Sequence, residues 1–131
     1  MTFKNVFVVD DDKISQFLVK KLLISSGVDA NPSFFENGFD AINNLKKFID
    51  CIECLPDLIL LDINMPVVDG WQFLEEFKML KQKLTKNIEI YIISSSDNSL
   101  DRLRAVDFKE EIRDYLLKPI TEESIKTMFS V

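Results

Sequence analysis

An aspartate directly follows four apolar residues in the segment LILLDINMPVVDGW, residues 58–71. The run from Leu58 to Leu61 is typical of a strand buried on both faces. A carboxylate at the end of such a strand loses hydration, and this is costly unless a cation or hydrogen-bond donors compensate it. The fold must therefore bring compensating groups to Asp62.

Apolar runs of strand length alternate along the chain with segments of helical periodicity. The expected strands cover residues 3–9, part of 27–38, 58–61, 88–93 and 115–117. The expected helices begin near Asp12, Gly38, Asp69, Asn98 and Thr121. The first helix should carry its apolar face at Ile14, Phe17, Leu18 and Leu22 and stop at Gly27. This alternation predicts an α/β fold, a doubly wound (βα)5 domain around a five-stranded parallel sheet.

Pro32 lies within the second expected strand. Proline cannot donate a hydrogen bond to a neighbouring strand, so this strand should lie at an edge of the sheet. An edge position for the second strand suits the flavodoxin-like order 2-1-3-4-5. In that order, ligands bind beyond the carboxyl ends of the strands, at the switch point between strands 1 and 3.

Composition excludes several classes of function. The 131 residues fit one domain, and no apolar run is long enough to cross a membrane. The amino terminus reaches Asp10 before it could form the apolar region of a signal peptide, so we expect a cytoplasmic protein. The net charge of -6 disfavours nucleic acid and anionic lipid as partners. The chain contains no histidine, which excludes histidine-based triads, histidine metal sites and a phosphohistidine carrier.

The two cysteines, Cys51 and Cys54, form a single CxxC pattern. A structural zinc site needs four ligands, and no further cysteine or histidine is present. We expect two ordinary thiols near a helix end. A redox pair is the alternative, which loss of function after alkylation of both thiols would support.

Polar residues follow four of the expected strands. They are Asp10, Asp11 and Asp12 after the first, Asp62 after the third, Ser94, Ser95 and Ser96 after the fourth, and Lys118 with Pro119 after the fifth. Carboxylates at one rim repel one another, and a divalent cation with oxygen ligands such as Mg2+ relieves that repulsion. A metal-bound carboxylate beside a lysine and a hydroxyl suits phosphoryl transfer, with an aspartate as nucleophile.

Four segments in this order resemble the receiver domain of two-component response regulators: FVVDDDK, PDLILLDINMPVVDG, IYIISSSD and DYLLKPIT. The resemblance spans nearly the whole chain and implies that Asp62 is the phosphoacceptor. It implies a Mg2+ site made by Asp11 directly, Asp10 through water, Asp62, and the backbone carbonyl of Asn64. Asp12 is then free to cap the first helix.

The resemblance assigns further roles around Asp62. Lys118 would contact the phosphoryl group, Ser94 would be the switch hydroxyl, and Tyr115 the aromatic residue whose rotamer follows that hydroxyl. Asn64 and Ser96 would influence the lifetime of the acyl phosphate, and Pro119 occupies a position where the family has a cis proline. Taken singly, each residue also has a purely structural interpretation. A carboxylate at a strand end can serve only as a helix cap, and the serines can serve only to start a helix. Tyr115 can serve only to pack against an edge strand, and Lys118 can be an ordinary surface charge.

The residues after Asn64 are expected to support the site rather than react. Pro66 should shape the loop, Asp69 should start the next helix, and Gly70 should allow a tight turn. Two departures from the family pattern are mild: Ser95 stands where a smaller residue is common, and the segment DCIECL, residues 50–55, is longer than usual.

The expected function is that of a single-domain response regulator, a switch rather than a turnover enzyme. A histidine kinase or phosphotransfer protein would supply the phosphoryl group, and a target would dock on the face formed by the fourth helix, fifth strand and fifth helix. Residues 1–131 should form one receiver domain without an output domain, monomeric or dimerising when phosphorylated. The sequence identifies neither the kinase nor the target.

Two alternatives remain. A haloacid-dehalogenase-type phosphatase also uses an aspartate and Mg2+, but it has a second aspartate two residues later, where this chain has Asn64. A degenerate receiver that only binds proteins would lack part of the site, whereas here the acidic pair, Asp62, the hydroxyl and the lysine are all present.

Overall fold

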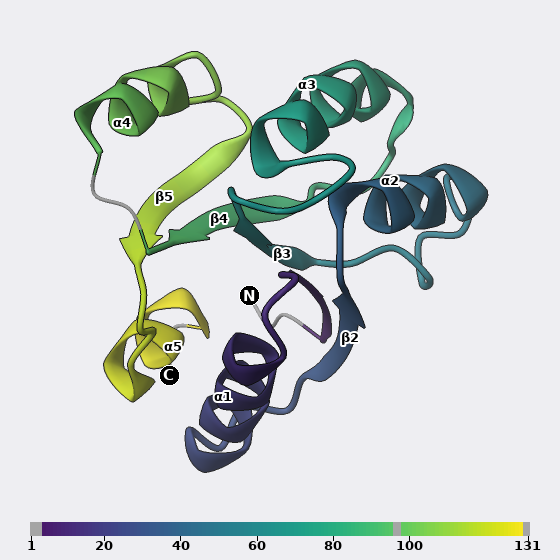
Figure 1. Ribbon diagram of the computed structural model, residues 1–131. Coiled ribbons are helices and arrows are strands. Elements are labelled where there is room, and N and C mark those ends of the chain that lie inside the picture. Colours follow the sequence, from purple (N-terminus) through teal and green to yellow (C-terminus); the bar gives the residue numbers. More distant parts are fainter. Residues whose placement is uncertain (1–3, 96–97, 130–131) are drawn as a thin grey trace.

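The computed structural model describes residues 4–95 and 98–129 (Figure 1). Strands and helices alternate, as the sequence predicts. In chain order they are β1 (Asn5–Val9), α1 (Lys13–Ser25), β2 (Asn31–Phe35), α2 (Gly38–Lys47), β3 (Leu58–Asp62), α3 (Gly70–Leu80), a 3-10 turn (Lys81–Lys83), β4 (Glu89–Ser94), α4 (Ser99–Val106), β5 (Ile112–Leu117) and α5 (Glu122–Phe129).

The five strands form one parallel sheet in the order β2-β1-β3-β4-β5, which confirms the predicted fold. Pro32 lies opposite Val6 on the edge strand β2, where its missing N–H leaves no gap in a central ladder. The order places β1 beside β3. The residues that follow these two strands therefore meet at one rim of the sheet.

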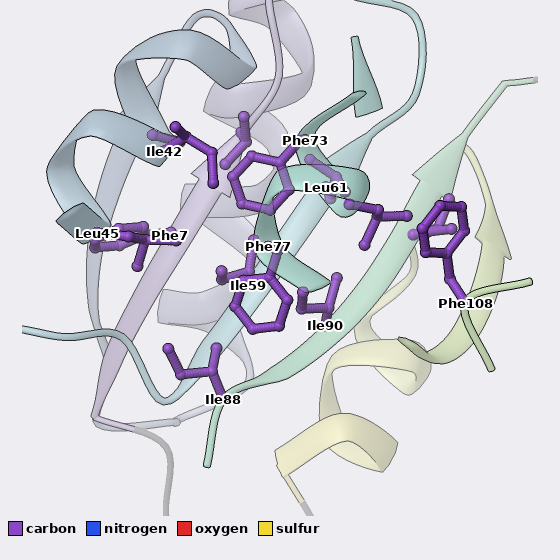
Figure 2. Close-up of a cluster of buried hydrophobic side chains, with 14 of the residues drawn as sticks. Phe7, Ile42, Leu45, Ile59, Leu61, Phe73, Phe77, Ile88, Ile90 and Phe108 are labelled. Carbon is purple, nitrogen blue, oxygen red and sulfur yellow. The ribbon is translucent and has the colours of Figure 1, made fainter. Parts of the chain in front are cut away.

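Helices cover both faces of the sheet (Figure 1): α1 and α5 lie on one face, and α2, α3 and α4 on the other. Alternate residues of the central strands point to opposite faces and both faces are covered, so β3 is apolar from Leu58 to Leu61. One face packs Ile59 and Leu61 with Phe73 and Phe77 of α3 (Figure 2). The other packs Leu58 and Leu60 against α1 and α5. Two cores thus hold β3, and with it Asp62, in place.

The predicted apolar face of α1 is only partly correct: Leu22 packs against the core on this side of the sheet, but Ile14 and Phe17 do not. Ile14 is 79% exposed and Phe17 60% exposed, while Val19 and Leu23 pack against the sheet. Both sets have helical spacing, so periodicity alone could not choose between them. Gly27 does end this segment, with a φ of 72° that suits glycine.

The fifth strand is longer than expected. It begins at Ile112 rather than Tyr115, and its first half contains the exposed residues Arg113 and Asp114. These charged residues conceal the strand pattern, and they can be exposed because β5 is an edge strand that pairs on one side only. The start of α4 agrees with the prediction, since the side chain of Asn98 accepts a hydrogen bond from Leu100 N.

Gly70 has a different role from the one expected. It is the first residue of α3 and has no positive φ. A Cβ atom on Gly70 would lie 2.6 Å from the carbonyl oxygen of Asp62, so a side chain there would push the helix away from the site. The unusual turn of this loop occurs instead at Val67, whose φ is 66°.

The structure also overturns the expectation of two ordinary thiols. Cys51 and Cys54 are joined by a disulfide bond in the connection between α2 and β3. Nothing in the sequence other than the CxxC spacing indicated this bond. Within residues 4–95 and 98–129, no helix is both long and apolar enough to cross a membrane.

Candidate functional site

Three carboxylates meet at the carboxyl ends of β1 and β3. Asp10 and Asp11 directly follow β1, and Asp62 is the last residue of β3. One oxygen atom from each of them lies within 4.8 Å of the others. Asp10 is 4% exposed and Asp62 5% exposed, whereas Asp11 is open to solvent. The parallel pairing of β1 with β3 therefore brings together residues that are 51 to 52 positions apart in sequence.

Lys118 supplies the positive charge at this rim. Its Nζ atom lies 2.8 Å from Oδ2 of Asp10 and 3.6 Å from Oδ2 of Asp62. Its backbone N–H donates to the carbonyl oxygen of Ser94 at 2.8 Å, which ties the end of β5 to the end of β4. The Lys118-Pro119 peptide bond is cis, as the resemblance implied.

The pKa values of Asp62 and Lys118 reflect the excess of negative charge at the buried rim of the sheet. Burial, followed by the charge of Asp10, raises the pKa of Asp62 to about 7, and the charge of Lys118 offsets only part of this rise. Burial by itself would lower the pKa of Lys118. The hydrogen bond to Asp10 and the charge of Asp62 outweigh burial, so the pKa of Lys118 stands above its ordinary value. One ammonium group does not fully compensate the buried carboxylates.

Local hydrogen bonds hold Asp10 in position. The backbone N–H of Asp12 donates to Oδ1 of Asp10 at 2.9 Å, and Nε2 of Gln16 donates to the carbonyl oxygen of Asp10 at 2.6 Å. Asp12 also accepts a hydrogen bond from Ile14 N at 2.9 Å. Asp12 therefore caps α1, as predicted, which leaves Asp10 and Asp11 to the site. The role of Gln16 was not predicted, because its contact is with backbone and has no sequence signature.

The loop after Asp62 is fixed from both of its ends. The backbone N–H of Gly70 donates to the carbonyl oxygen of Ile63 at 2.9 Å. Asp69 and Gln72 exchange hydrogen bonds of 2.9 and 3.0 Å in a capping box that starts α3. The supporting role predicted for Asp69 is confirmed.

The predicted switch residues occupy β4 and β5. Ser94 ends β4 and is fully buried. Tyr115 in β5 is also buried, and the guanidinium carbon of Arg102 on α4 lies 4.8 Å from the centre of its ring. This contact was missed, because the sequence does not show which residue of α4 faces β5. The contact connects α4 to the residue expected to act as the switch.

The residues assigned to phosphate lifetime receive less support. Asn64 lies exposed two residues after Asp62, and its role stays a prediction. Ser96 lies outside the described residues.

The donor set fits a hard divalent cation. Carboxylate oxygens are the ligands that Mg2+ prefers, and such a cation favours the charged form of Asp62 that burial disfavours. The candidate ligands are Asp10, Asp11 and Asp62.

A parallel (βα)5 sheet that gathers a buried aspartate, an acidic pair and a lysine at one rim defines a receiver-type α/β domain. The family model described as the response regulator receiver domain matches residues 6–130. The chain belongs to that family.

Individual known proteins are also similar to this chain in sequence and structure. The sensor histidine kinase CheAY of Helicobacter pylori is 28% identical over 123 residues, an alignment that covers 94% of this chain and 14% of the kinase. A crystal structure of a two component response regulator from Cytophaga hutchinsonii has a TM-score of 0.85 at 25% identity, covering 99% of this chain and 96% of that one. The Mn(2+)-bound form of response regulator Rcp1 has a TM-score of 0.74 at 26% identity, covering 97% and 90%.

Proposed function

We propose that this chain accepts a phosphoryl group on Asp62 and changes conformation in response, as a response regulator in a two-component phosphorelay. The main support is the position of Asp62 at the carboxyl end of a strand fixed by two cores, beside Asp10, Asp11 and Lys118. The proposal depends mainly on the geometry of the site, because the same fold supports other functions.

The chemistry follows from the groups present. An oxygen of Asp62 attacks the phosphorus of a partner's phosphohistidine, or of a small acyl or amido phosphate, and the leaving group departs with the electrons of the broken bond. The ammonium group of Lys118 is close enough to Asp62 to contact an oxygen of the transferred group. A Mg2+ ion bound by Asp10, Asp11 and Asp62 would neutralise further charge on the phosphoryl oxygens. Water later hydrolyses the acyl phosphate and resets the switch.

The response would pass through Ser94 and Tyr115. The phosphoryl group recruits the Ser94 hydroxyl, and Tyr115 adjusts with it, which shifts an existing equilibrium. The expected target-binding face consists of α4, β5 and α5. Exposed apolar side chains of this face are Leu100, Leu103, Val106 and Leu117. These side chains form an exposed apolar surface that a target protein can bury when it docks.

The phosphatase alternative is disfavoured. Asn64 stands where that class has its proton-donating aspartate, and family membership points to a receiver. The alternative of a pure binding module is disfavoured because a binding module does not need buried carboxylates beside Lys118.

The test is labelling with acetyl phosphate or phosphoramidate in the presence of Mg2+. We expect wild-type protein to gain one acid-stable, hydroxylamine-sensitive phosphoryl group, detected by mass. Asp62→Asn should lose it while its circular dichroism spectrum stays the same. Asp29→Asn is the matched control, because Asp29 is an exposed carboxylate before β2, at the opposite end of the sheet. Undiminished labelling of Asp62→Asn would refute the proposal.

A further inference from the structure

The CxxC segment is a feature that phosphoryl transfer does not use. Cys51 and Cys54 lie between α2 and β3 with their Cα atoms 5.3 Å apart and their sulfur atoms bonded. The backbone N–H groups of Cys54 and Leu55 donate to the carbonyl oxygen of Cys51, so the ring is built on a hydrogen-bonded turn. A bridge across two intervening residues constrains the unfolded chain less than one that closes a long loop. Stabilisation is therefore a weak explanation for it.

The bridge is open to attack from solvent. Cys54 is exposed and Cys51 half-buried, and the two residues between them, Ile52 and Glu53, are both exposed. An incoming thiolate therefore reaches the sulfur of Cys54 first. Attack on the sulfur of Cys54 makes the sulfur of Cys51 the leaving group.

Contacts other than the bridge also hold the backbone of this segment. Nζ of Lys86 donates to the carbonyl oxygens of Ile52 and Leu55 at 3.0 and 2.9 Å. Nδ2 of Asn5 donates to the carbonyl oxygen of Glu53 at 2.8 Å, and the side chain of Leu55 is buried. None of these contacts involves a sulfur atom, so we expect them to keep the two cysteines close together when the bridge is open. Opening and closing can thus occur without unfolding.

We propose that Cys51 and Cys54 form a reversible thiol–disulfide exchange site that reacts with dithiols. A thiolate of the dithiol attacks Sγ of Cys54, and the electron pair of the broken S–S bond goes to Sγ of Cys51, which takes up a proton. The second thiolate of the dithiol then attacks its own sulfur in the mixed disulfide and releases Cys54 as a thiol. The chain gains two electrons and two protons, and the dithiol becomes a disulfide.

This site is separate from the phosphoacceptor. The cysteines precede β3, whereas Asp62 ends it, so the length of a strand lies between them. The proposal therefore does not rest on the proposed function, and a thiol count tests it without involving Asp62.

The experiment equilibrates the native full chain in mixtures of oxidised and reduced dithiothreitol, quenches with acid, and counts thiols by maleimide mass shift. We expect a single transition from no free thiol to two, at the same mixture from either direction, with an unchanged circular dichroism spectrum. Two free thiols at the most oxidising mixture would overturn the proposal. So would a bridge that excess dithiothreitol opens only after guanidinium unfolds the chain.

Single-cysteine variants test the order of attack. In Cys51→Ser, the remaining Cys54 thiol should react with dithiobis(nitrobenzoate) several-fold faster than the Cys51 thiol does in Cys54→Ser. Neither variant should show the two-thiol transition. Equal rates, or faster reaction at Cys51, would overturn the assignment of Cys54 as the attacked sulfur.

Discussion

The ammonium nitrogen of Lys118 lies 2.8 Å from Oδ2 of Asp10, closer than it lies to the proposed phosphoacceptor Asp62. Asp10 thus holds the lysine at the rim by a short, largely buried ion pair, while the lysine remains within reach of Asp62. A phosphoryl group on Asp62 would compete with Asp10 for the same ammonium group. The ion pair therefore links the state of Asp62 to the end of β5.

Replacement of Lys118 by Met should destabilise the metal-free protein. Removing the ammonium group leaves Asp10 and Asp62 buried without their cation, which we expect to lower the free energy of unfolding at pH 8 by about 2–3 kcal/mol. Urea denaturation in EDTA measures this change. Lys118→Arg is the control that keeps the charge and should lose less. A Met variant as stable as wild type would show that the pair contributes nothing.

Asp62→Asn should stabilise the metal-free protein, increasingly so with rising pH. The pKa of Asp62 is about 7 in the folded chain against an ordinary value of 3.8, so between these pH values the unfolded chain has released a proton that the folded chain still holds. The Asp62 carboxyl therefore lowers the free energy of unfolding of the wild type as pH rises from about 4 to 7. Above pH 7 it causes no further loss. Each pKa unit corresponds to about 1.4 kcal/mol. Removing the charge of Asp62 also removes its attraction to Lys118, so we expect a net gain of about 1–3 kcal/mol at pH 8.

Urea denaturation of both proteins at pH 4.5, 6 and 8 in EDTA measures this difference. A gap between Asp62→Asn and wild type that shrinks with rising pH would contradict the raised pKa.

Affinity for Mg2+ should depend on pH through the same group. The ion binds the deprotonated carboxylate, so with a pKa of about 7 the affinity should rise about tenfold between pH 6 and pH 8. The increase of the melting temperature with Mg2+ concentration measures it. Asp62→Asn should show weaker binding and a flatter pH dependence, and EDTA should abolish the increase in both. Equal wild-type affinity at the two pH values would argue against Asp62 as a ligand.

Arg102→Ala should loosen Tyr115, the proposed switch residue. Loss of the guanidinium group over the ring is expected to cost about 0.5–1 kcal/mol of stability and to raise exposure of the ring. Fluorine NMR of fluorotyrosine-labelled protein, with a soluble quencher, reports that exposure. Arg102→Lys should keep part of the contact. An unchanged Tyr115 signal in the alanine variant would exclude this role for Arg102.

Val67→Gly should stabilise the protein despite the flexibility of glycine. Val67 adopts a φ of 66°, a left-handed conformation that costs a β-branched residue about 1–2 kcal/mol. Glycine costs roughly 0.5–1 kcal/mol because it loses more conformational entropy on folding, so the net gain should be about 0–1.5 kcal/mol. Thermal unfolding measures it. Val67→Ala, which keeps a Cβ atom, is the control and should not gain as much; equal gains would point to a cause other than backbone strain.

The sequence by itself determined the order of elements, the parallel sheet and the residues at its rim. Pro32 placed β2 at an edge, and the apolar run before Asp62 fixed β3, because these patterns depend on local periodicity and on the missing N–H of proline. The roles assigned to Asp62, Lys118 and Ser94 came from the family resemblance.

Only the tertiary structure decided which of two similar surfaces is buried and which distant groups meet. It buried Val19 and Leu23 instead of Ile14 and Phe17, because burial depends on the partner surface as well as on spacing. It brought Lys118 to Asp10, joined Cys51 to Cys54, and set Gly70 against the backbone of Asp62. Each of these relationships is a distance between atoms that are far apart in the sequence or differ in orientation. Such distances are set by how the chain packs, and the spacing of residues in the sequence does not determine them.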